Sequence, residues 1–196
     1  MQGTKYIVGV DEAGRGPLAG PVAVGIVLIP RNFNWRLILG VVDSKKITPR
    51  NREAIFQRAQ TLKKQGALNF CVVQVSAQVI DRIGITRSVA RGISRGLKKL
   101  NVNPTCTDIR LDGLLKAPPE FKKQKTIIKG DAKEKVIGLA SICAKVTRDR
   151  TMVSLARTYL PYDFDVHKGY GTQAHIATIK KYGLSKIHRR SFTKKL

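Results

Sequence analysis

The chain of 196 residues is long enough for one domain with a buried core, since 42% of its residues are hydrophobic. Its 37 Lys and Arg against 13 Asp and Glu give a formal net charge of +24, which favours a polyanionic partner, nucleic acid first. No window has the roughly 18 continuous apolar residues of a membrane-spanning helix, and the N-terminus lacks a signal-peptide core. These features exclude a transmembrane protein and favour a soluble, cytoplasmic one.

Cysteine usage agrees with a reducing compartment. Cys71, Cys106 and Cys143 are odd in number and far apart, so they support neither a disulfide framework nor a zinc site with paired cysteines. We expect them to be small buried side chains.

Two strands begin the chain. Residues 6–11 predict one strand and residues 22–29 a second, ended by Pro30, and their short connection favours an antiparallel pair. Between them lie two adjacent carboxylates, Asp11 and Glu12, in a glycine-rich segment around Arg15. Such backbone turns sharply or allows a ligand to approach closely. The alternative is a strand edge and turn with merely solvated carboxylates, but the acidic residues elsewhere favour a metal-dependent phosphodiesterase site.

The middle of the chain predicts helices and strands in alternation. Thr48 and Pro49 start a helix that ends near Gly66, residues 68–76 form a strand, and residues 85–100 form a helix. A separate face of that last helix carries a basic ridge, which suits phosphates although a charged helix face is often only solvated. The ridge consists of Arg87, Arg91, Arg95, Lys98 and Lys99.

Two further strands, 108–112 and 125–129, each deliver a carboxylate at the carboxyl end, namely Asp112 and Asp131. A long helix follows over 131–155, and because Asp131 precedes Glu134 by three residues, a capping box is a rival role for Asp131. A helix starting at Thr172 and a basic tail complete the chain.

This order predicts an α/β fold, a mixed sheet of about five strands flanked by helices, as one domain over residues 1–196 with a basic helical C-terminal segment. Sites in such sheets tend to lie at the carboxyl ends of strands, where we expect Asp11, Asp112 and Asp131 to converge.

Carboxylates suit phosphodiester hydrolysis. Paired divalent cations activate the water and clamp the leaving oxygen, and hard ions such as Mg²⁺ and Mn²⁺ prefer oxygen ligands. The rival ribonuclease chemistry uses the RNA 2′-hydroxyl with a pair of histidines. His167, His175 and His188 fit it poorly, because they cluster in the C-terminal region away from the carboxylates; a hydrogen-bonding or phosphate-facing role is expected instead.

Six segments, in this order and spacing, together resemble ribonuclease HII of the bacterial type over about residues 6–193. They are Asp11–Gly16, Asp43–Lys45, Asp112–Gly113, Lys129–Asp131, Ala140–Arg150 and His167–Thr172, with His188–Arg189 continuing the pattern. The resemblance implies an RNase H-like fold and an Mg²⁺- or Mn²⁺-dependent endonuclease. It would nick RNA/DNA hybrids, and duplex DNA with one embedded ribonucleotide, on the 5′ side of the ribonucleotide, as a monomer in the cytoplasm. No N-terminal domain of the ribonuclease HIII kind is expected.

The resemblance also implies site residues. The metal-binding catalytic carboxylates would be Asp11, Glu12, Asp112 and Asp131, and Asp131 could serve as cap and ligand. Substrate would be bound by Gly14, Arg15 and Gly16, which read the 2′-hydroxyl and adjoining phosphate, by Lys45 at a phosphate, and by Tyr170, which stacks on the sugar. Tyr170 could instead be a partly buried turn aromatic. A non-catalytic RNA-binding protein and another RNase H-like nuclease or recombinase remain alternative functions.

Overall fold

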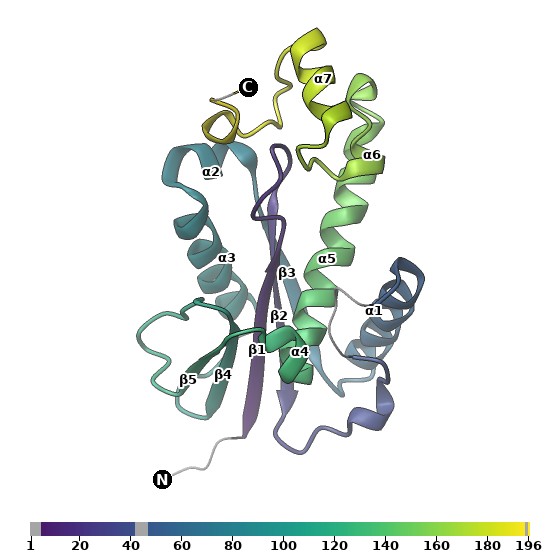
Figure 1. Cartoon of the computed structure of the whole chain (residues 1–196). Helices are drawn as coiled ribbons and strands as arrows, with labels where there is room; N and C mark the ends of the chain where they lie inside the picture. Colours follow the sequence, from purple (N-terminus) through teal and green to yellow (C-terminus); the bar gives the residue numbers. More distant parts are fainter. Residues whose placement is uncertain (1–4, 42–46, 195) are drawn as a thin grey trace.

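The computed structural model describes residues 5–41, 47–194 and 196, and its centre is one five-stranded sheet in the order β3-β2-β1-β4-β5 (Figure 1). β2 is antiparallel to β1 and β3, whereas β4 is parallel to β1 and β5. This confirms the mixed sheet and the antiparallel first pair. The strands are β1 (Tyr6–Ala13), β2 (Val22–Pro30), β3 (Asn69–Val75), β4 (Thr107–Asp112) and β5 (Gln124–Ile127).

Helices cover both faces of the sheet: α2 and α3 lie on one side, α1 and α5 on the other, and the C-terminal helices form one end of the molecule (Figure 1). The longer helices are α1 (Pro49–Lys64), α3 (Ile85–Lys99), α5 (Lys135–Ala156) and α7 (Gln173–Tyr182), and the shorter ones are α2 (Ala77–Ile83), α4 (Gly130–Lys133) and α6 (Phe164–His167). Single 3₁₀ turns occur at Trp35–Leu37, Leu160–Tyr162 and Arg190–Phe192.

Side-chain alternation divides the core between the two faces. Val8 and Val10 of β1 pack with the apolar stripe of α3, while Ile7 and Gly9 of the same strand face α5. On that second face Gly9 and Gly25 let α5 approach very closely: a Cβ at Gly9 would lie 2.2 Å from the carbonyl oxygen of Val136, and one at Gly25 would lie 2.2 Å from that of Ala140. α5 therefore rests almost directly on the backbone of β1 and β2.

Helix signals in the sequence were accurate at α1 and α7. The hydroxyl of Thr48 accepts a hydrogen bond from the amide of Asn51, with Pro49 in the first turn, and the hydroxyl of Thr172 accepts one from the amide of His175. α2 was not expected from the sequence.

The predicted capping box at Asp131 is wrong. β5 ends at Ile127, Lys129 turns the chain with a φ of +55°, and Asp131 lies inside the short helix α4 while Glu134 precedes α5. Asp131 is thus four residues beyond a strand end rather than at it. The turn brings the amide of Gly130 to the Asp112 side chain, 2.6 Å away, and the extended backbone of Glu134 separates α4 from α5.

Cys71, Cys106 and Cys143 are buried free thiols, as expected. No helix in the described ranges has the length and apolar character needed to cross a membrane.

The close approach of α5 gives a stability prediction. Gly9→Ala should lower the free energy of unfolding by about 2 kcal/mol or more, because the added methyl meets backbone that has no room to yield. Urea unfolding followed by circular dichroism measures this. Gly16→Ala is the control: no atom lies within 4 Å of its Cβ position, so its effect should stay within about 0.5 kcal/mol. Equal stability of the two variants would contradict the packing described.

Candidate active site

Asp11 and Glu12 are adjacent on β1, so their side chains point to opposite faces of the sheet. Asp11 is only 5% exposed and hydrogen-bonds with Ser141 of α5, and one of its oxygens accepts the amide of Glu12 at 2.7 Å. Glu12 faces the α3 side. The two carboxylates therefore lie on opposite faces of the sheet, near the carboxyl end of β1.

Asp112 lies beside them. Val10 of β1 is paired with Leu111 of β4, so Asp11 and Asp112 follow at the same level on neighbouring parallel strands. The hydrogen bond from the Gly130 amide to Asp112 then brings the next residue, the buried Asp131, to the same end of the sheet. Three separate segments thus deliver carboxylates to one region.

The electrostatics show that the first three carboxylates interact. Burial raises the pKa of Asp11 well above its ordinary value, and the charges of Glu12 and Asp112 raise it further, against the hydrogen bond from Ser141. The pKa of Glu12 is also raised, first by burial and then by Asp112, while Arg15 opposes the shift. Like charges are held together here at a cost that a cation would relieve.

The residues present fit a hard divalent cation. Oε2 of Glu12 is buried without a hydrogen-bond partner among the described residues, and the donor set is all carboxylate oxygen. Among those residues, however, no three or more His, Cys, Asp or Glu side chains already converge as a finished ligand set. Asp11, Glu12, Asp112 and Asp131 are the residues that could hold such ions.

An open cleft of about 470 Å³ adjoins the carboxylates on the α3 side. Glu12 and Asp112 line its acidic end, Arg15 and Lys116 contribute positive charge, and α3 forms an apolar wall that includes Val89. The carboxylates are therefore open to a ligand that approaches along α3.

The Gly14–Gly16 loop follows β1. Gly14 has a φ of +91°, and a Cβ there would lie 2.0 Å from Nε of Arg148, so only glycine fits. Arg15 has a half-exposed side chain whose Nη1 is 3.4 Å from Oε1 of Glu12, and Gly16 faces open space. The loop is thus closely packed behind and open in front.

Tyr170 lies next to this loop, because the amides of Leu18 and Ala19 both donate to the carbonyl of Gly169. Its side chain is 44% exposed, and its ring centroid lies 5.9 Å from the guanidinium carbon of Arg148. The structure therefore brings Tyr170 together with Gly14–Gly16, and an exposed ring is free to meet a ligand.

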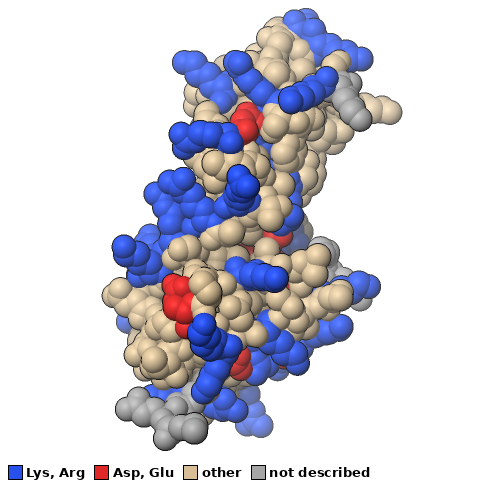
Figure 2. All heavy atoms as spheres, turned by 90° about the vertical axis from the view of Figure 1, so that its left-hand side faces the viewer, with Lys and Arg blue, Asp and Glu red and all other residues tan. Residues whose placement is uncertain are grey.

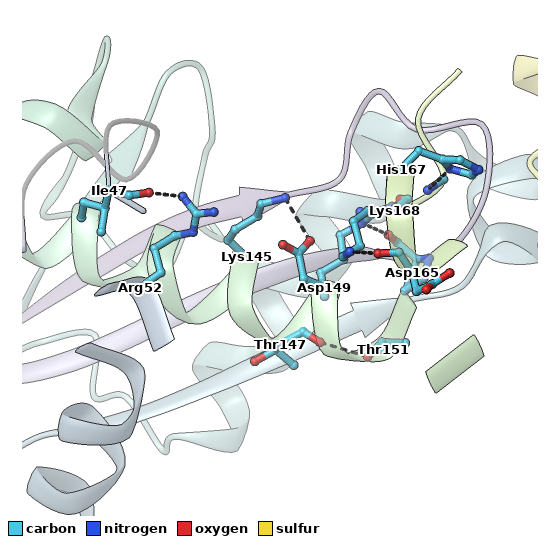
Figure 3. A network of polar contacts seen from close by, with 12 residues as sticks. Ile47, Arg52, Lys145, Thr147, Asp149, Thr151, Asp165, His167 and Lys168 are labelled. Carbon is cyan, nitrogen blue, oxygen red and sulfur yellow. Dashed lines mark hydrogen bonds and ion pairs between the residues drawn. The ribbon is translucent and has the colours of Figure 1, made fainter. Parts of the chain in front are cut away.

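Lys45 lies outside the described residues. A hollow of about 360 Å³ between α1 and α5 is bordered by cations, among them Arg52 and Lys168. Figure 3 shows Arg52, which donates to the carbonyl of Ile47, near Lys145, which pairs with Asp149 at 2.9 Å.

The three histidines form one cluster, in which His175 and His188 are buried and His167 is partly exposed. The amide of Ser185 donates to Nδ1 of His188, so the proton of neutral His188 is on Nε2 and is donated to Nε2 of His175 over 3.0 Å. His175 in turn donates from Nδ1 to the carbonyl of Tyr170, and burial lowers the pKa of both rings, that of His188 to about 4. The hydrogen-bonding role is confirmed, and their ring nitrogens are not free for acid–base chemistry.

The basic ridge of α3 is fully on the surface. None of Arg87, Arg91, Arg95, Lys98 and Lys99 pairs with an acidic side chain in the described ranges, and all five are exposed. Figure 2 views the side of the molecule that carries α3, where Lys and Arg far outnumber Asp and Glu. Such a surface suits a phosphate backbone.

Three polar residues that contact the site were not assigned from the sequence: Ser141, Arg148 and Arg189. Ser141 and Arg148 occur in the segment 140–150 that carried the family resemblance, and Arg189 follows a histidine of the same resemblance. Nothing in the sequence shows that these three side chains are buried. For Arg148 and Arg189, burial is the property that distinguishes them from the many surface arginines.

Comparison with known proteins agrees with this geometry. The family described as Ribonuclease HII matches residues 8–195. The ribonuclease HII of Caldicellulosiruptor bescii is 43% identical over 195 residues, covering 100% of this chain and 90% of that protein. The crystal structure of the ribonuclease H2 from Pyrococcus horikoshii OT3 superposes with a TM-score of 0.76 at 31% identity, covering 96% of this chain and 94% of that one.

A structure of Bst-RNase HIII in complex with Mn²⁺ shares the fold, with a TM-score of 0.72 at 20% identity, covering 97% of this chain and 68% of that one. The predicted RNase H-like fold is thereby confirmed. With a family match along nearly its whole length and a relative above 40% identity, this chain belongs to the ribonuclease HII family of endoribonucleases, which act on RNA/DNA hybrids.

Proposed function

We propose that this ribonuclease HII cleaves the phosphodiester on the 5′ side of a ribonucleotide, both in RNA/DNA hybrids and at single ribonucleotides in duplex DNA, leaving 3′-hydroxyl and 5′-phosphate ends. Asp11, Glu12, Asp112 and Asp131 hold the Mg²⁺ or Mn²⁺ ions. The observation that carries this proposal is the burial of Asp11 beside two further carboxylates, Glu12 and Asp112, that raise its pKa. An RNA-binding protein without catalysis has no use for such a costly arrangement.

Divalent cations, when bound, supply a Lewis acid for the phosphate and an activated water. The chain itself holds the carboxylates in place: the Glu12 amide and Ser141 bind Asp11, and the Gly130 amide binds Asp112. Each of these bonds fixes an oxygen that would otherwise retreat from its negative neighbours. The fold relative solved with Mn²⁺ is compatible with this assignment.

Recognition of the ribose is proposed for the open side of the Gly14–Gly16 loop, with Tyr170 stacking on the sugar and Lys45 at a phosphate. The support is the shared position of the loop and Tyr170, and the exposure of the Tyr170 ring. The 2′-hydroxyl, as donor and acceptor, is the handle that separates RNA from DNA.

The basic ridge of α3 is proposed to bind the duplex backbone, because α3 also forms a wall of the cleft that ends at Glu12 and Asp112. We further propose a cytoplasmic monomer: a charge of +24 disfavours self-association, and three free thiols suit a reducing compartment.

Asp112→Asn tests the catalytic assignment. Cleavage of a duplex with one ribonucleotide should fall by about a thousandfold or more, since a metal site is worth several kcal/mol of transition-state stabilisation. Duplex affinity should largely persist, because phosphate contacts dominate it. Gel assays with end-labelled duplexes containing one, four or no ribonucleotides measure both. Cleavage of all-DNA duplex, 2′,3′-cyclic phosphate products, or full activity in excess chelator would contradict the proposal.

Asp11→Asn should raise the stability of the metal-free protein and reduce the stabilisation that metal binding provides. Without metal the variant should be more stable than the wild type at pH 7.5, since it removes a buried charge beside Glu12 and Asp112. The raised folded-state pKa makes that charge destabilising above this pKa, so the gain should shrink as pH falls toward 4.

Thermal melts with and without Mn²⁺ measure how far the metal stabilises each variant. At a hundredfold excess over Kd, Mn²⁺ should stabilise the wild type by about 2.7 kcal/mol and Asp11→Asn far less. The exposed acid Glu120 supplies the control, Glu120→Gln, which should respond to Mn²⁺ as the wild type does. An equal response of Asp11→Asn would place the metal elsewhere.

The salt dependence of duplex affinity tests the proposed role of the basic ridge. The triple variant Arg87→Ala, Arg91→Ala, Arg95→Ala should reduce the slope of log affinity against log salt by up to about 3, one unit for each lost phosphate contact. Arg31→Ala, Arg36→Ala, Lys64→Ala removes the same charge near the opposite end of the sheet and should leave the slope nearly unchanged. Equal slopes for the two triple variants would show that only net charge matters.

A further inference from the structure

Two arginines are buried behind the Gly14–Gly16 loop. Arg189 is 0% exposed and Arg148 is 1% exposed, and neither forms an ion pair with an acidic side chain of the described residues. Asp81, whose charge acts on Arg189, uses its oxygens for the amides of Arg190 and Ser191 and the hydroxyl of Ser191 instead. A buried cation without a carboxylate is costly, and such a residue needs other strong partners.

Backbone carbonyls are those partners. Arg189 donates from Nη2 to Gly14 at 2.7 Å, from Nη1 to Arg15 at 2.8 Å and from Nε to Gly20 at 3.0 Å. Arg148 donates from Nε to Pro21 at 2.9 Å and from Nη2 to Ala19 at 3.2 Å and Lys168 at 3.0 Å. Both guanidinium groups therefore bind the connection between β1 and β2, and Arg148 also holds the turn that carries Tyr170.

The direction of these carbonyls determines what the loop presents outward. A trans peptide places its N–H opposite its C=O, and no cis bond occurs in the described chain. Because the carbonyls of Gly14 and Arg15 point inward to Arg189, the amides of Arg15 and Gly16 point away from it. Neither amide donates to another described residue. Two consecutive free N–H groups on one side of a loop form a binding site for an oxygen or anion.

We propose that Arg189 and Arg148 are positioning residues for ribose recognition: they orient the peptide units of Gly14 and Arg15 so that two amides face the 2′-hydroxyl and adjoining phosphate. This inference rests on the proposed function and assigns a role to side chains that never touch substrate. Their two buried charges lie behind the loop and add a positive field that also attracts a phosphate on its open side.

The experiment measures discrimination, defined as the Kd for an all-DNA duplex divided by the Kd for the same duplex with one ribonucleotide. All variants carry Asp112→Asn so that no cleavage occurs, and Mg²⁺ is present. Arg189→Lys keeps the charge but cannot span three carbonyls, so discrimination should fall by about tenfold or more. Affinity for all-DNA duplex should stay within about twofold, since phosphate contacts elsewhere are unchanged.

A control separates positioning from loss of stability. Ile179→Ala removes a buried side chain of α7 that forms no hydrogen bond to Gly14–Gly16, and it should lower the melting temperature while discrimination is retained. Arg148→Lys provides a second variant with the same expected loss. In both lysine variants, the positive charge that is retained should not by itself restore discrimination.

The outcomes are distinguishable. If Asp112→Asn alone fails to discriminate, the proposed recognition of ribonucleotides fails, whatever the arginines do. If it discriminates and both lysine variants keep that ratio, the positioning role is overturned. A parallel fall in Ile179→Ala would show that discrimination follows stability, which would also overturn it.

Discussion

The close contact of α5 with β1 and β2 is the constraint on which the site depends. Two glycines, Gly9 and Gly25, let the helix backbone rest against the sheet backbone, which a single methyl group would prevent. Ser141 then reaches Asp11, and Arg148, two turns and about 10 Å farther along, reaches the connection between β1 and β2. One rigid helix thus sets the distance between the carboxylates and the proposed ribose-binding loop.

The surface of the protein is basic, whereas the proposed active site is acidic. The surface is strongly basic, and the α3 ridge lacks acidic partners, so a polyanion is attracted over a broad face. The interior of the site is acidic, with Asp11 and Glu12 held at raised pKa. A phosphate drawn to the basic face would be repelled by these carboxylates unless cations lay between them. Divalent ions held by the carboxylates would remove this repulsion, and on the proposed function substrate binding would then depend on metal binding.

The sequence predicted much of this arrangement because its signals are local. Alternating apolar residues, the Thr48 and Thr172 caps and the glycine-rich turn each depend on near neighbours, and the strands and helices they predict are present. The exception is Asp131, where the spacing to Glu134 suggested a capping box. In the structure Asp131 lies within the short helix α4, whose first amide, that of Gly130, donates to Asp112, and α5 begins only after the extended Glu134.

Tertiary contacts explain what the sequence could not predict. Among 37 Lys and Arg, nothing local distinguishes Arg148 and Arg189 from surface residues, because their burial depends on carbonyls more than a hundred residues away. The convergence of three histidines is similarly invisible in sequence. The family resemblance supplied the roles of the carboxylates, and the fold supplied the reason that they lie together.

The central claim is that four carboxylates from three segments share divalent ions at the end of β1 and β4. A crystal structure with Mn²⁺, using anomalous scattering to locate the ions, tests it most directly. The account predicts anomalous peaks within coordination distance, about 2.2 Å, of oxygens of Asp11, Glu12, Asp112 and Asp131, with paired ions about 4 Å apart. Peaks only at other sites, or side chains of these four residues remaining apart in saturating Mn²⁺, would contradict it.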